Sequence, residues 1–189
     1  MKLSPGPGDA LLVVDVQKDF LPGGALAVAQ GDEVVAPLNA AIRAFERAGR
    51  PIYASRDWHP ANHCSFKARG GPWPPHCVAG TRGAEFADGL ALPASAVLVS
   101  KAGSPDADAY SAFGGNDLAA QLQRKGVRRV VIGGLTTDYC VVNSVLDARA
   151  AGFEVVVLAD AIRAVDVQPG DGARALEAMR KAGARLEAA

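Results

Sequence analysis

Cys140 has the surroundings of a catalytic nucleophile. It ends the polar segment Gly133–Cys140, which follows an apolar run and precedes a stretch whose apolar residues recur at helical spacing. We expect Cys140 near the first turn of that helix, where free backbone N–H groups and the helix dipole favour a thiolate. The alternative is a buried cysteine that packs as a small apolar side chain. Because the glycines, the threonines and Asp138 beside it are poor core formers, the sequence favours a nucleophile.

Asp15 and Lys101 are expected to join Cys140. Asp15 directly follows the apolar run 11–14, and Lys101 follows the run 97–100. The carboxyl ends of parallel strands meet at one edge of a sheet, which would bring the three side chains together. Burial raises the pKa of a carboxyl group and a neighbouring ammonium lowers it, so such a pair can be tuned for acid–base catalysis. The same ammonium would lower the thiol pKa, whereas a purely structural Asp15–Lys101 ion pair would leave the cysteine inert.

A second group of residues has the composition of a metal site. Asp57 and His59 lie two apart at an expected strand end, so both side chains can project to the same side. Together with His76 they supply one carboxylate and two imidazoles, a set suited to one divalent ion such as Zn²⁺, Fe²⁺ or Mn²⁺. We expect zinc, with iron or manganese as alternatives, and His63 is a further candidate ligand. Histidines that only line a polar loop are the competing interpretation.

Aromatic residues near these positions are candidates for the walls of a pocket. Phe20, Trp73 and Tyr110 lie in expected loops and could flank a flat substrate, although aromatic side chains are more often found in a core. The segments 58–83 and 104–115 interrupt the alternation of strands and helices, and the first carries both tryptophans and all three histidines. Long irregular segments in a compact domain are usually functional or disordered, and the histidines and aromatic residues that these two carry favour a functional role.

The order of apolar and amphipathic segments indicates an α/β fold. Continuous apolar runs, typical of strands buried on both faces, alternate with segments of helical periodicity. We expect an open, doubly wound parallel sheet of about six strands with helices on both faces. The expected strands are 11–16, 51–55, 96–100, 129–133, 154–159 and a short edge strand at 184–186. The expected helices are 32–48, capped by Asp32, then 116–125, the stretch after Cys140, and 169–182.

Length and composition place further bounds on the protein. At 189 residues the chain is expected to form a single domain, residues 1–189, with a sizeable core. Its 20 basic and 20 acidic residues give zero formal net charge and are dispersed, so no nucleic-acid partner is expected. We expect no signal peptide and no membrane span, because the first residues lack a basic and apolar leader pattern and no apolar run is long enough, and an odd count of three cysteines suggests no disulfide framework. A cytoplasmic protein without a membrane partner fits best.

Several motifs along the chain resemble the nicotinamidases of the isochorismatase-like hydrolase superfamily. The Asp–Lys–Cys set marks the superfamily, and the metal cluster with the Tyr-Ser-Ala-Phe run points to nicotinamidase, also called pyrazinamidase. The resemblance implies a six-stranded parallel sheet and hydrolysis of nicotinamide to nicotinate and ammonia in NAD salvage, with pyrazinamide as a second substrate. The motifs occur in the family's order and span nearly the whole chain: Asp15–Phe20, Asp57–Pro60, Trp73–Cys77, Lys101, Tyr110–Phe113 and Thr137–Cys140.

The resemblance also implies a role for each catalytic residue. Cys140 would attack the carboxamide carbon, Asp15 would take the thiol proton and later pass one to the departing ammonia, and Lys101 would hold Asp15 ionised. The Leu135–Thr136 peptide corresponds to the family's cis peptide, which would aim the Thr136 N–H at the oxyanion together with that of Cys140. Hydrolysis of the resulting thioester would complete the reaction.

The resemblance assigns the metal the role of a template for the substrate. Held by Asp57, His59 and His76, the metal would bind the pyridine nitrogen, and a fourth protein ligand varies between relatives. Phe20 and Trp73 would sandwich the ring. Relatives range from monomers to tetramers, so a homo-oligomer is compatible with the sequence. The substrate-binding residues predicted in this way are Phe20, Trp73, Tyr110 and Leu135.

Two positions depart from the family's usual pattern. Leu135–Thr136 stands where relatives often have an Ile-Ala-like pair, and Tyr139 occupies a position often filled by a small or polar residue. These differences bear on the oxyanion hole and on the rim of the pocket.

Three other functions stay open on the sequence. Another cysteine amidohydrolase of the superfamily, acting on a carbamoyl or ureido compound, would usually lack the metal cluster. An isochorismatase would not need Cys140 for its ether-cleaving chemistry. A non-catalytic module that binds a pyridine carboxamide would need neither a nucleophile nor a base beside it.

Overall fold

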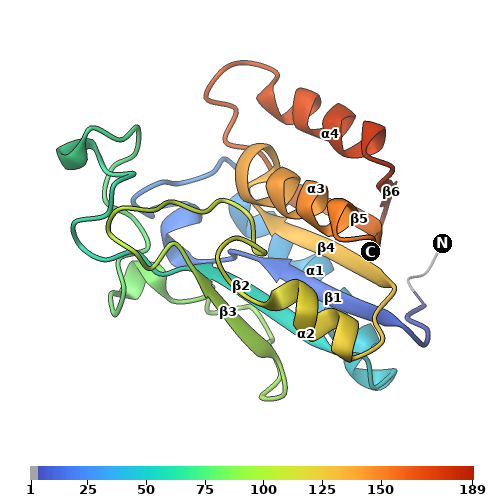
Figure 1. Ribbon diagram of the computed structural model, residues 1–189. Coiled ribbons are helices and arrows are strands. Elements are labelled where there is room, and N and C mark those ends of the chain that lie inside the picture. The colour runs from blue at the N-terminus through green and yellow to red at the C-terminus, as the bar shows by residue number, and fades with distance from the viewer. Residues whose placement is uncertain (1–3) are drawn as a thin grey trace.

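Six parallel strands form one open sheet in the order β3-β2-β1-β4-β5-β6 (Figure 1). The structure is a computed structural model that describes residues 4–189. It confirms the predicted open, doubly wound α/β architecture. The strands are β1 (Asp9–Val14), β2 (Ile52–Asp57), β3 (Val97–Lys101), β4 (Arg129–Leu135), β5 (Glu154–Arg163) and β6 (Arg185–Glu187).

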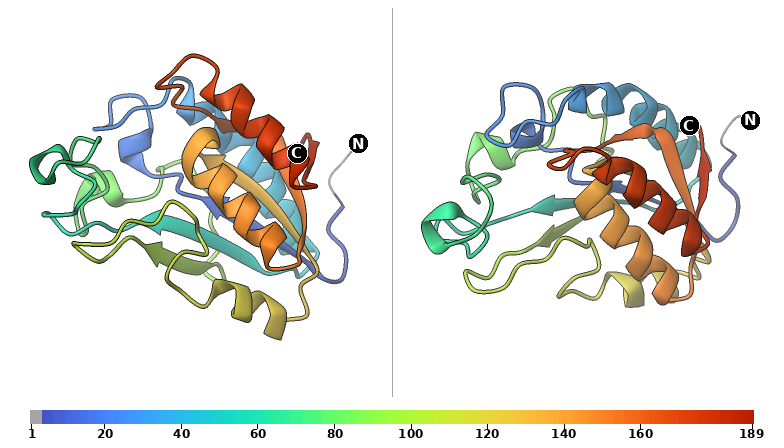
Figure 2. Two further views of the ribbon diagram at one scale, coloured as in Figure 1. Left: turned by 45° about the horizontal axis from the view of Figure 1, so that its top comes forward. Right: turned by 90° about the horizontal axis from the view of Figure 1, so that it is seen from above.

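Helices cover both faces of the sheet (Figure 2). Helix α1 (Val35–Arg47) packs its apolar stripe on one face, and the other three helices cover the opposite face. Every residue of β1 is buried because alternate side chains enter the two cores, which explains its continuous apolar sequence. No helix within residues 4–189 is long and apolar enough to cross a membrane. The three helices on the second face are α2 (Leu118–Arg124), α3 (Val142–Ala150) and α4 (Asp171–Lys181).

The elements differ from the predicted ones at their boundaries and in one helix type. The helix predicted from Asp32 begins as a 3₁₀ turn, Gly31–Val34, and neither this turn nor α1 has a side-chain cap. The helix predicted from Asn116 begins at Leu118, with Asp117 at the N-cap position and no side-chain cap. Asn116 lies one residue earlier, and its side-chain oxygen accepts a hydrogen bond from the Leu118 N–H at 3.0 Å. Cys140 lies in a π-helical turn, Thr137–Val141, which directly precedes α3. Such turns are rare and occur frequently at functional sites.

The strand order reverses between β1 and β4, which are neighbours in the sheet. At such a point the connections leave toward opposite faces, and a crevice opens beyond the carboxyl ends of the two strands. Asp15 directly follows β1 and Thr136 directly follows β4. The irregular segments 58–83 and 102–115 lie at this same end of the sheet, at the left in Figure 1. The fold therefore gathers the candidate site residues at one edge.

Gly134 is required by the close approach of β4 to β1. Its φ is 134°, and a Cβ atom built on it would lie 2.0 Å from the Val14 carbonyl oxygen. We predict that Gly134→Ala lowers the free energy of unfolding by about 3 kcal/mol or more. Gly126→Ala is the control, because Gly126 also has positive φ (69°) but meets nothing within 4 Å, so only about 1 kcal/mol should be lost. Urea unfolding measures both, and equal losses would contradict the steric explanation.

Candidate active site

Hydrogen bonds hold Cys140 in place at the end of β4. The Thr136 carbonyl accepts from the N–H groups of Tyr139 and Val141, at 3.2 and 3.0 Å, and these bonds shape the turn. Ser144 donates its hydroxyl to the Cys140 carbonyl at 2.6 Å. Cys140 is only 4 % exposed and lines a pocket. Its sulfur is therefore positioned by the backbone on both sides.

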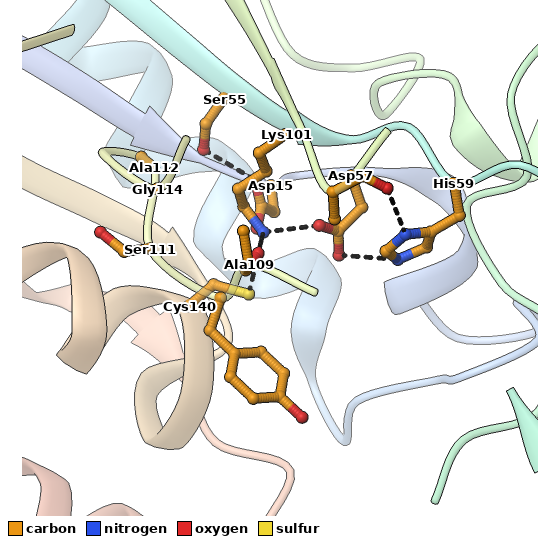
Figure 3. A network of polar contacts seen from close by, with 12 residues as sticks. Asp15, Ser55, Asp57, His59, Lys101, Ala109, Ser111, Ala112, Gly114 and Cys140 are labelled. Carbon is orange, nitrogen blue, oxygen red and sulfur yellow. Dashed lines mark hydrogen bonds and ion pairs between the residues drawn. The ribbon is translucent and has the colours of Figure 1, made fainter. Parts of the chain in front are cut away.

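The ammonium group of Lys101 lies at the centre of a buried ion-pair network (Figure 3). Its Nζ atom is 3.0 Å from Asp15 Oδ2 and 2.5 Å from Asp57 Oδ1. The same nitrogen lies 3.5 Å from Cys140 Sγ. Ser55 donates its hydroxyl to the other Asp15 oxygen at 2.7 Å. The structure thus brings Asp15, Lys101 and Cys140 together from three distant parts of the chain, as the sequence predicted.

The register of the strands explains this convergence. Asp57 stands opposite Lys101 in the β2–β3 pair, and Val14 stands opposite Ser55 in the β1–β2 pair. Asp15 leaves β1 with a left-handed backbone (φ 46°), which is uncommon outside glycine but better tolerated by aspartate than by most residues. The pairing of the sheet therefore sets the distances between the charged groups.

The electrostatics of Cys140 differ from the sequence prediction. Burial raises the pKa of the thiol well above its usual value, and Lys101 offsets only part of this because Asp15 and Asp57 act against it. The prediction that the site favours a thiolate was wrong: the thiol keeps its proton until a base removes it. Burial also raises the pKa of Asp15, although Lys101 opposes the shift. The raised pKa makes the Asp15 carboxylate a better base for that proton.

Asp57, His59 and His76 form a candidate metal site. One ligand atom from each lies within 4.8 Å of the other two. The His59 Nδ1 contacts the Ala102 carbonyl at 3.2 Å and the His76 Nδ1 contacts the Pro74 carbonyl at 2.8 Å. Each ring thus donates its Nδ1–H to a backbone oxygen and leaves its Nε2 atom to bind a metal ion. This is the usual arrangement for histidines that bind metals. This donor set fits one divalent cation.

The charges around Asp57 also suit a cation. Burial alone would raise the pKa of Asp57, but Lys101 and His59 outweigh it and hold the pKa below its usual value. Lys101 itself stays protonated because Asp15 and Asp57 outweigh the effect of its burial. The ionised Asp57 carboxylate supplies negative charge that a divalent cation needs among its ligands.

Gln17 is a supporting residue that the sequence did not reveal. Its side-chain amide donates to the Asp57 carbonyl at 2.8 Å and accepts from the Asp57 N–H at 2.8 Å. A further bond from the same amide reaches the Ala84 carbonyl at 2.9 Å. Gln17 is fully buried, so these bonds fix the backbone of a metal-ligand candidate. A glutamine three residues after a buried strand is the signal that could have identified it.

His63 lies beside the candidate metal site but its ring nitrogens face elsewhere. Its ring stacks on that of His59, with centroids 4.1 Å apart. The Nδ1 atom contacts the Ser65 hydroxyl at 2.7 Å and Nε2 contacts the Ala107 carbonyl at 3.2 Å. Both nitrogens are thus engaged, and His63 joins the segments 58–83 and 102–115. The structure does not bring it into the ligand cluster.

One pocket connects the nucleophile with the candidate metal site. It encloses about 390 Å³ including its open mouth, and Cys140, Asp57, His59 and His76 all line it. Leu135 does not: its side chain is fully buried in the core on the α1 face of the sheet, so the prediction that it binds substrate finds no support. The predicted aromatic residues Phe20, Trp73 and Tyr110 do line the pocket.

Other lining residues come from loops without periodic sequence patterns, and this is why the sequence did not identify them. Val165, after β5, is held against the pocket by Asp138, whose carboxylate accepts from the N–H groups of Val165 and Asp166 at 3.0 and 2.8 Å. The lining residues not assigned to the site from sequence are Leu26, Ser65, Asp108 and Val165, whereas Tyr139, which the sequence related to the rim, also lines the pocket.

The residues that carry the predicted oxyanion donors line the pocket. The Leu135–Thr136 peptide is cis, as the resemblance implied. Within residues 4–189 no acceptor is found for the Thr136 N–H, and the Thr136 hydroxyl is buried without a partner. Thr136 and Cys140 both line the pocket. A free N–H beside a nucleophile can donate to negative charge that develops on a carbonyl oxygen.

The sequence matches a known protein family over most of its length. The model of the isochorismatase domain matches residues 9–189. The chain belongs to the isochorismatase family. It is 40 % identical to the nicotinamidase of Escherichia coli, over 95 % of this chain and 94 % of that protein. It is 38 % identical to the nicotinamidase/pyrazinamidase of Mycobacterium tuberculosis, over 94 % of this chain and 97 % of that protein. The crystal structure of the pyrazinamidase of Pyrococcus horikoshii in complex with zinc is similar to this structure, with a TM-score of 0.92 and 51 % sequence identity. The match covers 97 % of this chain and 100 % of that chain.

Two histidine variants test the metal site of this isochorismatase-family protein. His59→Ala removes a ligand candidate, and we predict at least about tenfold weaker zinc binding. His63→Gln removes the neighbouring ring, whose nitrogens are engaged elsewhere, and should leave one zinc per chain. Elemental analysis after dialysis measures both. Full metal content in His59→Ala, or equal loss in both variants, would refute the assignment.

Proposed function

We propose that this chain hydrolyses nicotinamide to nicotinate and ammonia, and pyrazinamide in the same way. The observation that carries the proposal is that Asp57 belongs to both clusters. Its Oδ1 pairs with Lys101, and its Oδ2 lies 3.6 Å from His59 Nε2. A nucleophile and a candidate metal site are thereby held side by side around one aromatic-lined pocket. This arrangement suits a flat ring that carries both a ring nitrogen and a carboxamide. The relatives named nicotinamidase support it.

Acylation would begin with proton transfer from the Cys140 thiol to Asp15. Burial has raised the pKa of Asp15, which reduces the cost of this transfer. As the proton leaves, the Lys101 ammonium, 3.5 Å from Sγ, stabilises the negative charge on sulfur. Sγ then bonds to the carboxamide carbon. Asp15 passes its proton to the amide nitrogen, the C–N bond breaks, and ammonia departs from a thioester.

The oxyanion and the second half of the reaction would use the same groups. The N–H groups of Thr136 and Cys140 donate to the oxygen as it becomes negative, and one such donor is worth about 3 kcal/mol of barrier. Water then adds to the thioester carbon while Asp15 takes one of its protons. The C–S bond breaks, Cys140 recovers its proton from Asp15, and the carboxylic acid product gives its remaining proton to solvent and leaves as nicotinate.

Asp57, His59 and His76 would hold the metal ion, with zinc expected and iron or manganese as alternatives. When bound, the metal supplies a Lewis acid that binds the pyridine nitrogen and so orients the ring. Phe20 and Trp73 would flank the ring. Orientation matters because the carboxamide carbon must come within about 3.5 Å of the nucleophile.

A second function, hydrolysis of a carbamoyl or ureido compound by the same cysteine, would need no metal. The candidate metal site of Asp57, His59 and His76, in which both histidine Nδ1 atoms are hydrogen-bonded to backbone carbonyls, argues against this second function. A carbamoyl or ureido substrate has no ring nitrogen that a metal ion could bind. A non-catalytic pyridine-carboxamide module would have no use for the Asp15–Lys101–Cys140 cluster.

We further propose that the chain works as a single domain in the cytoplasm. The three cysteines are free thiols, which fits a reducing compartment.

Ammonia release tests the function directly. With nicotinamide and the zinc-loaded protein, an enzyme-linked ammonia assay should show a turnover of about 1 s⁻¹ or faster, with an equal amount of nicotinate by chromatography. Binding of nicotinamide without ammonia would favour the binding module. Release of ammonia only from carbamoyl compounds, by protein without stoichiometric metal, would favour the second function.

Cys140→Ala tests the nucleophile. We predict that turnover falls by about 10³-fold or more while nicotinamide still binds with a similar Kd, because the pocket and the metal ligands stay intact. Isothermal titration calorimetry measures the binding, and elemental analysis confirms the metal content. Retained turnover in this variant would overturn the assignment.

A further inference from the structure

Cys77 connects the two histidines of the candidate metal site. It directly follows His76, and its carbonyl accepts a hydrogen bond from the His59 N–H at 3.0 Å. The His59 carbonyl in turn accepts from the Ala79 N–H at 2.8 Å, so that His59 pairs with Val78 in a short parallel bridge. The orientation of the Cys77 peptide therefore affects where both histidine rings lie.

Cys77 has a backbone conformation that its neighbours must maintain. Its φ of 45° lies in the left-handed region, which is unfavourable for residues other than glycine because the Cβ atom approaches a carbonyl oxygen. Such a conformation persists only where the surrounding structure fixes it. The Cys77 side chain is fully buried in the core on the α1 face of the sheet, and its N–H donates to Asp19 Oδ2 at 2.7 Å. The bond to Asp19 thus holds the residue that links His59 and His76.

The Asp19 carboxylate is itself held in place. Its Oδ1 atom accepts from the Ala25 N–H at 3.2 Å, and the Asp19 backbone carbonyl accepts from the Leu26 N–H at 2.9 Å. A Cβ atom built on Gly83 would lie 2.1 Å from Oδ2, so the carboxylate occupies space that a side chain at this position would fill. These contacts give Oδ2 a defined position opposite the Cys77 N–H.

We propose that Asp19 is a positioning residue for the metal site: its carboxylate fixes the Cys77 peptide so that His59 and His76 converge on one divalent cation. This inference rests on the metal site of the proposed function. Asp19 lies outside the ligand cluster and acts through the backbone. Hydrogen-bonded groups behind metal ligands typically contribute about 10- to 100-fold to metal affinity, because they orient the ligands before the metal binds.

A purely electrostatic role for Asp19 is the competing explanation. A carboxylate near His76 would attract a cation without any hydrogen bond to Cys77. Asp19→Asn separates the two roles, because it removes the charge but keeps an oxygen that can accept from the Cys77 N–H. The bond to the Ala25 N–H is longer and exposed, so water can replace the second oxygen there.

The zinc affinity of the full-length protein tests the proposal, measured by competition with a chromophoric chelator. For Asp19→Ala we expect the Kd for zinc to rise by about tenfold or more, whereas Asp19→Asn should stay within about threefold of the wild type. The visible absorption spectrum of the cobalt-loaded protein reports the coordination geometry. It should change in Asp19→Ala and match the wild type in Asp19→Asn.

Asp9→Ala is the matched control. It removes a carboxylate that accepts from the Gly6 N–H at the same distance, 2.7 Å, and pairs with Arg129 at the opposite end of β1 from Asp15. It should lower the midpoint of thermal unfolding but leave the zinc Kd and the cobalt spectrum unchanged. A merely structural role for Asp19 would make the two alanine variants behave alike.

If Asp19→Ala does not fold, Asp19→Ser takes its place, because a serine hydroxyl would stand where the carboxyl carbon is now, one bond short of Oδ2. Wild-type zinc affinity in a folded Asp19→Ala or Asp19→Ser protein would overturn the inference. So would an equal loss of affinity in Asp19→Asn, which would indicate charge, or in Asp9→Ala, which would indicate stability alone. A wild-type protein that binds no zinc would instead refute the metal site of the proposed function, and the inference with it.

Discussion

The buried ammonium of Lys101 is the interaction on which the site depends. A charge that is fully removed from water is tolerated only with close partners of opposite sign, and Lys101 has two, Asp15 and Asp57. Each partner also serves a second group: Asp15 lies beside the Cys140 thiol, and Asp57 belongs to the candidate metal site with His59. One ion-pair network therefore ties the acid–base group, the nucleophile and the metal ligands into a single unit. Removal of Lys101 would leave the carboxylates of Asp15 and Asp57 buried without a compensating positive charge.

The topology of the sheet makes this network possible. The reversal of strand order between β1 and β4 opens a crevice at their carboxyl ends, and the β2–β3 register places Asp57 opposite Lys101. The segments 58–83 and 102–115 then close over the crevice. They are joined to one another at His63 and Ala107 and at Trp73 and Tyr110. The rigid sheet positions the charges, and the joined loops shape the pocket above them.

Burial determines the chemistry as much as the choice of residues does. Removal from water disfavours the charged forms of both Cys140 and Asp15, and it raises both pKa values. The lysine, which suggested a thiolate, offsets only part of the effect of burial on the thiol pKa, and the two carboxylates act in the same direction as burial. The result is a protonated thiol beside a strengthened base. The charged sulfur would then form during the reaction, where Lys101 can stabilise it.

The sequence by itself determined the fold class, the strand order along the chain and the identity of the reactive side chains. Those features follow from apolar periodicity and from residue types at strand ends, which are local signals. Only the tertiary structure decided how they combine. It placed Leu135 in the core, engaged both nitrogens of His63 outside the metal cluster, added Gln17 as the support of Asp57, and set the direction of the Cys140 pKa. Each of these depends on neighbours that are distant in sequence and on burial, which no local pattern encodes.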